Sequence, residues 1–335
     1  MDWFERLTGF RETLYAETQS RLSVIDGRLH SPGTDRTYAV GTLTLPSLAE
    51  LRSAAGAVRR SGRLRLSIVE GDVRAMHRQP ENRGALFQVA SQFNMLEMVS
   101  PTVTPEDGVT RYEHDRTQGP ACAMAAGAAT IFRNYLVPVA EGFGQTADRQ
   151  LDGLADLGAA LSQHLDVTTE TLWTMRNGYA LATRDGLTAV SDHLRDADVG
   201  SLDELRGLLR VGLHADVEVT DGPSPGPLVS QVFCSALPVA YGRLPASTWA
   251  SFARLVLEAA YEATLLASRL NAARGASNRV LLTRLGGGAF GNDDAWIDQA
   301  IVRALRCAGD DDLDIAIVSY GPPSRSLQDL VRSVR

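Results

Sequence analysis

The chain has 335 residues, which suits one large domain or two ordinary ones and leaves ample length for a buried core. All 33 of its basic residues are arginine, because the sequence contains no lysine. This excludes Walker, Schiff-base and pyridoxal-phosphate lysines, and with them most P-loop and lysine-nucleophile enzymes. The net charge of −7 counts against broad nucleic-acid binding, so we expect nucleic acid as a partner only if it is a modified substrate.

Three scattered cysteines, Cys122, Cys234 and Cys307, form no CxxC pair and have no histidine at metal-ligand spacing. We therefore expect no disulfide framework and no metal site, and no residue pattern requires a cofactor. No apolar run approaches membrane-spanning length, and the first residues lack a basic leader followed by an apolar core. These features predict a cytoplasmic protein with no membrane partner.

Residues 1–60 are predicted to form an N-terminal extension packed on the rest of the chain. Ser47 is followed three residues later by Glu50, which is typical of a capped helix start. The expected elements are a helix at 3–19, strands at 22–25 and 37–45, and a helix at 47–60.

Residues 61–335 are predicted to form one domain in which strands alternate with helices. Such alternation gives a sheet covered by helices on both faces. The sequence therefore predicts an α/β fold with a three-layer α/β/α core and a mixed, largely parallel sheet. The expected strands are 63–70, 85–93, 229–241, 279–285 and 314–320, and the expected helices are 121–136, 247–274, 295–306 and 326–334.

Two irregular stretches interrupt this pattern. Residues 101–120 are polar and rich in turn residues, as in loops that are either functional or disordered. Residues 138–226 are predicted to be a large insertion. Its expected elements are helices at 145–164 and 201–209, short strands at 178–182 and 217–219, and an exposed loop, DGPSPGP, at 221–227.

The sharpest motif is the sequence GGGAFGN at residues 286–292, between the strand RVLLT and a helix that begins near Asp293. Glycines let backbone N–H groups approach an anion closely, and the N-terminus of the following helix favours negative charge. The loop therefore suits a diphosphate, although a glycine-rich stretch can also serve only to turn the chain.

Polar side chains follow two other predicted strands. Asp72 comes after the run IVEG, at the strand end where α/β folds place ligands, and its carboxylate could accept a hydrogen bond from an adenine amino group. Gln92 and Asn94 follow the next strand, and their amides could bind ribose hydroxyls. A turn, a helix cap or a loop brace would explain the same residues.

The loop after Asn94 concentrates carboxylates ahead of the sequence TQG at residues 117–119. Glu97 and Asp115 could orient or deprotonate a water molecule, while Thr117, Gln118 and Gly119 could donate backbone N–H groups to phosphate. An acidic solvated loop followed by an ordinary helix start is the simpler interpretation.

In this order the motifs resemble the macrodomain family, in segments scattered between about Leu64 and Gly321. The run GDV at 71–73 is similar to the family's GDI element, whose aspartate recognises adenine, and Asn94 to the asparagine at the distal ribose. The run GGGAFGN, the strand LDIAIVSYG at 313–321 and the terminal helix are similar to the second phosphate loop and last strand. VSQVFCSALP at 229–238 is similar to a strand that leads to the same cleft.

The resemblance implies a divergent, enlarged macrodomain that binds ADP-ribose or an ADP-ribosylated molecule. In the leading hypothesis it hydrolyses the ADP-ribosyl linkage with water. The usual asparagine-rich strand exit with a glycine triplet is absent, so a non-catalytic reader of ADP-ribose is the main alternative, and a scaffold that binds no ligand is a third. The implied site is Asn94, Glu97 and Asp115 for catalysis, and Asp72, Val73, Gln92, Thr117, Gln118, Gly119, Gly286, Gly287, Gly288, Ala289, Phe290, Gly291, Asn292 and Tyr320 for binding.

Overall fold

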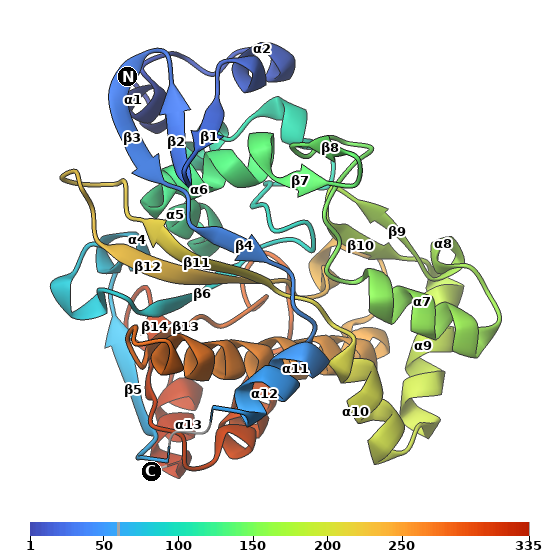
Figure 1. The fold of residues 1–335 in the computed structure, drawn as a ribbon. Helices are drawn as coiled ribbons and strands as arrows, with labels where there is room; N and C mark the ends of the chain where they lie inside the picture. Colours follow the sequence, from blue (N-terminus) through green and yellow to red (C-terminus); the bar gives the residue numbers. More distant parts are fainter. Residues whose placement is uncertain (59–60, 335) are drawn as a thin grey trace.

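The computed structural model describes residues 1–58 and 61–334 (Figure 1). Residues 59–60, at the end of the helix predicted for 47–60, lie outside the described residues. The described part of that helix is α3 (Leu48–Gly56). It begins with the predicted cap, because the Ser47 side chain accepts a hydrogen bond from the N–H of Glu50 and the Glu50 carboxylate accepts one from the N–H of Ser47.

A seven-stranded sheet forms the centre of the molecule, with the order β4-β11-β12-β6-β13-β14-β5. Neighbouring strands from β12 to β5 are parallel, whereas β11 is antiparallel to both β12 and β4. This confirms the predicted α/β class with a mixed, largely parallel sheet. The strands are β4 (Thr42–Thr44), β5 (Arg65–Glu70), β6 (Leu86–Ala90), β11 (Gly212–Glu218), β12 (Leu228–Cys234), β13 (Arg279–Leu282) and β14 (Asp314–Ser319).

Helices cover both faces of the sheet (Figure 1). In β6, Leu86 packs toward one helical layer and Phe87 toward the other, because successive side chains of a strand point to opposite faces. One layer contains α3, α11 (Ala246–Ala273), α12 (Asp294–Ala308) and α13 (Arg325–Val334). The other contains α4 (Val73–Met76), α5 (Gln118–Ala125) and α6 (Gly127–Ile131).

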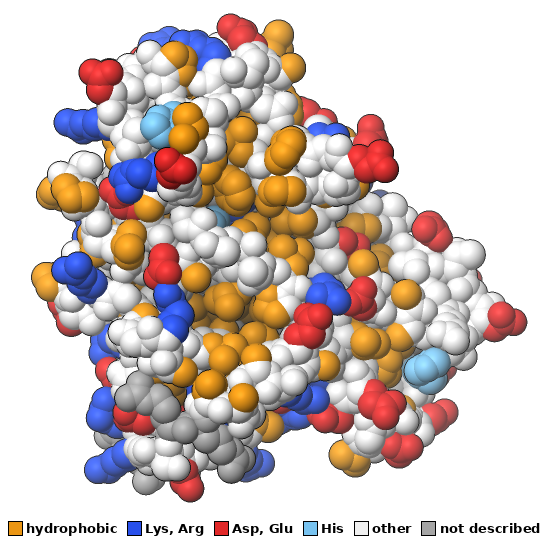
Figure 2. Space-filling model, in the orientation of Figure 1, with side chains coloured by type: hydrophobic (Ala, Val, Ile, Leu, Met, Phe, Trp, Pro, Cys, Tyr) orange, Lys and Arg blue, Asp and Glu red, His pale blue; other side chains and the backbone are white. Residues whose placement is uncertain are grey.

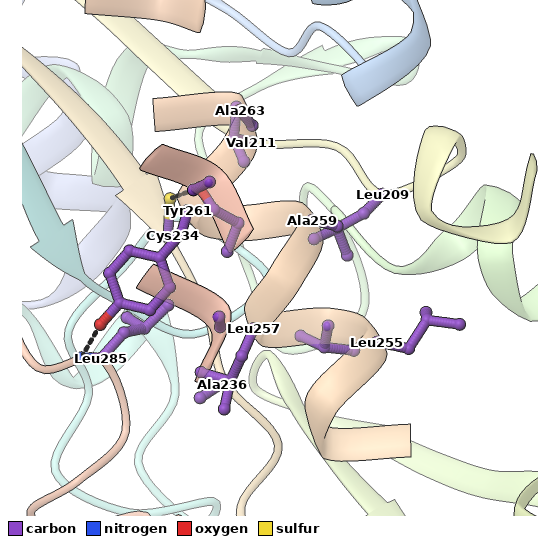
Figure 3. Packing of buried hydrophobic residues seen from close by; sticks show 14 of the residues in the cluster. Leu209, Val211, Cys234, Ala236, Leu255, Leu257, Ala259, Tyr261, Ala263 and Leu285 are labelled. Carbon is purple, nitrogen blue, oxygen red and sulfur yellow. Dashed lines mark hydrogen bonds between the residues drawn. The ribbon is translucent and has the colours of Figure 1, made fainter. Parts of the chain in front are cut away.

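The long helix α11 anchors the start of the glycine loop. Figure 3 shows Tyr261 of this helix within the buried apolar cluster, beside Cys234 of β12. Its hydroxyl donates to the carbonyl of Thr283 and accepts a hydrogen bond from the N–H of Leu285. The loop therefore leaves the sheet from a fixed point in the core.

The N-terminal segment does not form the single helix predicted for residues 3–19. It forms α1 (Trp3–Thr8) and α2 (Tyr15–Ser20), because Gly9 ends α1 in a left-handed conformation with φ 73°. A three-stranded antiparallel sheet follows, made of β1 (Ser23–Ile25), β2 (Arg28–Ser31) and β3 (Thr34–Ala39). The extension also supplies β4 to the central sheet, so the boundary proposed near residue 60 separates paired strands.

The polar loop at 101–120 is ordered by two short 3₁₀ helices, η2 (Pro105–Asp107) and η3 (Thr110–His114). The helix predicted for 121–136 is divided into α5, α6 and a π-helical turn, η4 (Phe132–Leu136). Another 3₁₀ turn, η1 (Pro80–Asn82), precedes β6, and η5 (Val239–Tyr241) follows β12. The strand predicted for 229–241 therefore ends early, at Cys234.

The predicted insertion holds a helical layer and a hairpin, and it also supplies β11 to the central sheet. Helix α9 is the largest element that the sequence analysis missed. The remaining elements are β7 (Pro138–Val139), β8 (Gly142–Phe143), α7 (Ala155–Leu165), α8 (Thr169–Leu172), β9 (Trp173–Arg176), β10 (Tyr179–Ala182), α9 (Arg184–Asp196) and α10 (Val199–Gly207).

The surface carries charged side chains around the outline of the face shown in Figure 2, with hydrophobic side chains gathered nearer its middle. None of the helices in residues 1–58 and 61–334 is both long enough and apolar enough to span a membrane.

Candidate functional site

A cleft of about 780 Å³ lies at the carboxyl ends of β6, β12 and β13, where parallel α/β sheets place their ligands. Five segments of the chain meet there. They are the exit of β6, the loop that leads into α5, the start of β10, the segment after β12 and the glycine loop after β13. The predicted site residues that line the cleft are Gln92, Glu97, Asp115, Thr117, Gln118, Gly119, Gly286, Gly288, Ala289 and Phe290.

The glycine loop presents backbone donors to this cleft. Its own turns use the N–H groups of Gly287, Gly291 and Asn292, which donate to carbonyl groups within residues 284–288. In the described part of the chain, the N–H groups of Gly288, Ala289 and Phe290 have no protein acceptor. A Cβ atom added at Gly288 would meet no heavy atom within 4 Å, so this residue faces open space. The loop can therefore bind an anion through three adjacent donors.

The N-terminus of α5 forms the opposite wall. Thr117 is the N-cap residue, but its hydroxyl donates to Asp115 and does not cap the helix. The Gln118 side chain accepts a hydrogen bond from the N–H of Ala90 and donates to the carbonyl of Gln88, which fixes the helix start to β6. At Gly119 a Cβ atom would lie 2.1 Å from the Ala90 carbonyl oxygen, so only glycine allows this contact.

Glu97 is a buried carboxyl group that lines the cleft. Its Oε1 atom accepts a hydrogen bond from Arg133 at 3.2 Å, and both side chains are fully buried. No described residue donates to its Oε2 atom. Burial raises the pKa of Glu97 to about 7, although the positive charge of Arg133 acts in the opposite direction. A carboxyl group with such a pKa can both donate and accept a proton near neutral pH.

Asp115 is half-buried at the mouth of the cleft. Its Oδ1 atom accepts hydrogen bonds from the N–H and the hydroxyl of Thr117, at 2.8 and 2.6 Å. No arginine within the described ranges pairs with it. The carboxylate thus shapes the entry to α5, and Asp115 and Glu97 both line the cleft.

Three aromatic rings form the remaining wall. Tyr179 lies 5.1 Å from Tyr241 and 5.3 Å from Phe290 between ring centroids, and the last two rings are 5.7 Å apart. The Tyr179 hydroxyl donates to the carbonyl of Met98, and the Gln92 side chain accepts a hydrogen bond from the N–H of the same residue. Tyr179 and Gln92 therefore hold the chain at Met98, the residue that follows Glu97.

Asn94 does not line the cleft. It is fully buried, donates to the Gln150 side chain and accepts a hydrogen bond from the N–H of Leu96. Gln150 in turn donates to Asn177 of the β9–β10 turn. These contacts match the loop brace that the sequence analysis left open.

Other predicted binding residues also lie outside the cleft lining. Asp72 is exposed after β5 and caps α4 by accepting a hydrogen bond from the N–H of Arg74, while Val73 is buried in that helix. Tyr320 follows β14, the neighbour of β5, and is 83% exposed. The structure thus leaves the ends of β5 and β14 separate from the cleft.

Within the glycine loop, Gly287 packs near Ile297 and Gly291 near Ala240, and the buried Asn292 side chain donates to the carbonyl of Leu237.

The sequence analysis missed Tyr179, Tyr241 and Arg133. The Asn177–Gly178 pair offered a signal for Tyr179, because these residues favour the two-residue turn of a hairpin. Arg133 lies in a predicted helix with no neighbouring motif, and only the folded chain brings it to Glu97. No group of three or more potential metal ligands occurs in residues 1–58 and 61–334.

No protein-family model matches the chain, and a search of the curated proteins found no match. Among solved structures, the chain is similar to poly(ADP-ribose) glycohydrolase from Thermomonospora curvata bound to the inhibitor ADP-HPD. The identity is 14%, the match covers 95% of each chain, and the TM-score is 0.44. Poly(ADP-ribose) glycohydrolase from Deinococcus radiodurans in complex with ADP-ribose is 13% identical, with 87% of this chain and 92% of that chain covered and a TM-score of 0.44.

Proposed function

We propose that the protein binds ADP-ribose or an ADP-ribosylated molecule in this cleft and hydrolyses the ADP-ribosyl linkage, with Glu97 as the catalytic carboxyl group. The macrodomain-like motifs of the sequence suggest the ligand, and the cleft supplies the chemistry. The observation that carries the proposal is the buried Oε2 atom of Glu97, which has no hydrogen-bond partner among the described residues, in a residue that lines a cleft beside the free backbone donors of the glycine loop.

The two phosphate groups of such a ligand suit the two backbone walls. The N–H groups of Gly288, Ala289 and Phe290 would bind one phosphate, and the N-terminus of α5 would bind the other. Backbone dipoles stabilise an anion without adding a mobile cation to the cleft. The lack of lysine is therefore compatible with a diphosphate ligand.

The reaction needs a proton at the leaving group and the loss of a proton from water. The bond between the anomeric carbon and the leaving group breaks, and its electron pair stays with the leaving group, which takes a proton. The oxygen of water forms the new bond to the anomeric carbon and loses a proton. Glu97 can carry out either transfer because its pKa lies near 7, and Asp115 is the second candidate to activate water.

Asp72 and Tyr320 remain candidates for the adenine end of the ligand. They follow the paired strands β5 and β14, and both are exposed. Adenine bound there would extend from the cleft along the carboxyl ends of the sheet.

Titration calorimetry with ADP-ribose tests the binding half of the proposal. We expect the parent to bind and Gly288→Glu to lose affinity by more than tenfold, because the new carboxylate faces the phosphates without disturbing the fold. Gly288→Gln is the matched control for side-chain size, and Asp72→Ala tests the adenine end. If the parent protein does not bind ADP-ribose, the remaining alternative is a scaffold that binds no ligand.

The reader alternative is supported by one observation. Oε1 of Glu97 is held by Arg133, and Oδ1 of Asp115 is engaged within its own loop. Incubation with an ADP-ribosylated protein and detection of free ADP-ribose distinguishes the two functions. Release by the parent, and none by Glu97→Gln, would support hydrolysis, whereas binding without release would support the reader.

A further inference from the structure

The buried pair of Glu97 and Arg133 lies immediately behind the cleft. A guanidinium group that only neutralised Glu97 would need one contact, yet Arg133 makes several. Its Nε atom donates to the carbonyl of Met95, and one terminal nitrogen donates both to Glu97 and to the hydroxyl of Thr130. Its guanidinium carbon lies 3.9 Å from the centroid of the Phe233 ring. Contacts to Met95, Glu97, Thr130 and Phe233 thus fix its position.

Removing two charged groups from water is costly, and this pair is not required for packing alone. Replacement of a buried ion pair by apolar residues of similar volume is often neutral or stabilising. Here Arg133 binds one carboxylate oxygen, and the other oxygen, which is also buried, has no hydrogen-bond partner among the described residues, in a side chain that borders the cleft. A carboxyl group that acts as an oriented acid or base requires one oxygen to be held in position and the other to have no partner, and the two oxygens of Glu97 differ in this way.

We propose that Arg133 is the positioning residue of the site, holding Oε1 of Glu97 in place so that the unpartnered Oε2 stays available for proton transfer beside the cleft. This inference rests on the proposed function for its catalytic consequence, but the coupling between the two side chains does not depend on it.

The titratable groups around the pair are few. Tyr112 of η3 accepts a hydrogen bond from the N–H of Glu97, and Cys122 of α5 is buried nearby. His214 of β11 lies 3.5 Å from a terminal nitrogen of Arg133, and burial holds its pKa well below the usual range, so it is neutral. Toward the solvent, the charged residues of the cleft are Arg111, His114, Asp115, Arg116 and Arg284. Arg133 is therefore the cation in direct contact with Glu97.

The test compares Arg133→Lys and Arg133→Met with the parent. The carboxyl stretch of Glu97 is followed by infrared spectroscopy as a function of pH and assigned by its loss in Glu97→Gln. Loss of the guanidinium removes an attraction that favours the ionised form, so the midpoint moves upward by about 1 to 3 pH units in Arg133→Met. It moves by less in Arg133→Lys, because the ammonium group keeps the charge but not the fork of donors.

Turnover supplies the second readout. We expect Arg133→Lys to lower kcat by about 10²-fold, because a small displacement of a catalytic group has that effect, while the affinity for ADP-ribose stays close to that of the parent. Arg269→Lys is the matched control. Arg269 forms another buried pair, with Asp311 near the amino ends of the strands, and its replacement is expected to lower stability without moving the Glu97 midpoint.

A Glu97 midpoint in Arg133→Lys equal to that of the parent would overturn the proposal, and so would an unchanged kcat. If Arg133→Met fails to fold, Arg133→Lys decides the question. If the parent releases no ADP-ribose, the proposed function fails, and the infrared midpoints still decide whether Arg133 controls the state of Glu97.

Discussion

Residues 1–58 and 61–334 contain two arginine–carboxylate pairs in which both residues are buried, one near each end of the sheet, and the Arg133–Glu97 pair borders the cleft described above. Arg269 of α11 donates to Asp311 at 2.7 Å and to the carbonyl of Ala55, close to the amino ends of the strands. Arg133 donates to Glu97 at the carboxyl ends, where the second carboxylate oxygen has no described partner. The same kind of pair thus joins core segments at one end of the sheet and leaves one carboxylate oxygen without a described partner at the other.

The largest effect, a loss of activity, is expected when the buried pair at the cleft is altered. Glu97→Gln keeps the shape of the side chain but removes its proton transfer, so we expect the rate of ADP-ribose release to fall by about 10²- to 10⁴-fold. The affinity for ADP-ribose should change little, because in the proposed binding mode the phosphates contact backbone groups. Turnover assays and titration calorimetry on the same preparations measure both quantities. A rate close to that of the parent would assign catalysis to another group, with Asp115 the first candidate.

The contrast between the two pairs predicts the opposite result for Arg269 and Asp311, namely a loss of stability without a loss of activity. Arg269→Met leaves the Asp311 carboxylate buried without its partner, and the free energy of unfolding should fall by about 3–5 kcal/mol. Urea denaturation measures this loss. The affinity for ADP-ribose and the kcat of the folded fraction should match the parent, and a change in either would show that the two ends of the sheet are coupled.

The turn between β9 and β10 offers a third test, because it braces the chain around Glu97. Gly178 has φ 76°, and an added Cβ atom would lie 2.6 Å from both the Asn94 side chain and that of Gln92. Gly178→Ala should therefore lower the free energy of unfolding by about 2–4 kcal/mol and also reduce kcat. Gly275→Ala is the control, since that glycine has φ 88° and no heavy atom within 4 Å. If Gly178→Ala and Gly275→Ala change the free energy of unfolding and kcat equally, the turn between β9 and β10 does not brace the chain around Glu97.

The fold was largely predictable because the strands of the parallel core are short apolar runs separated by clear helical patterns. The glycine loop was also predictable, since its residue types carry the backbone geometry. The two strands at the antiparallel edge of the sheet, β11 and β4, were harder to predict from the sequence. β11 lies in a polar stretch and β4 in the predicted extension, and their pairing joins segments about 170 residues apart, which local periodicity does not reveal.

The site residues were predictable from the sequence only where they lie close to one another along the chain. Gln92, Glu97 and the TQG run follow one another along the chain and do meet at the cleft. Arg133 reaches Glu97, and Tyr241 reaches the cleft, through contacts between distant segments, and no local pattern distinguishes them from core residues. Asn94 has the right position in sequence for a ligand contact, but the insertion binds its side chain instead.

The pH dependence of stability separates Glu97 from a second buried group whose effect has the opposite sign. His77 stacks on Phe87, and burial lowers its pKa to about 4, so its contribution to stability is present above the ordinary histidine pKa and is lost as the pH falls from about 6.5 toward 4. Glu97 has a raised pKa, so its contribution is present at low pH and is lost as the pH rises from about 4.5 to about 7.

Between about pH 7.5 and about pH 5 the two contributions therefore largely cancel in the parent. In Glu97→Gln the opposing contribution of Glu97 is removed while those of His77 and His214 remain, so acidification over this range should cost about 2 kcal/mol more of unfolding free energy than in the parent. Urea denaturation at both pH values measures the difference, and the groups common to both proteins drop out of the comparison. An equal loss in both proteins would mean that Glu97 does not gain a proton in this range, and the carboxyl group facing the cleft would then serve only as a base.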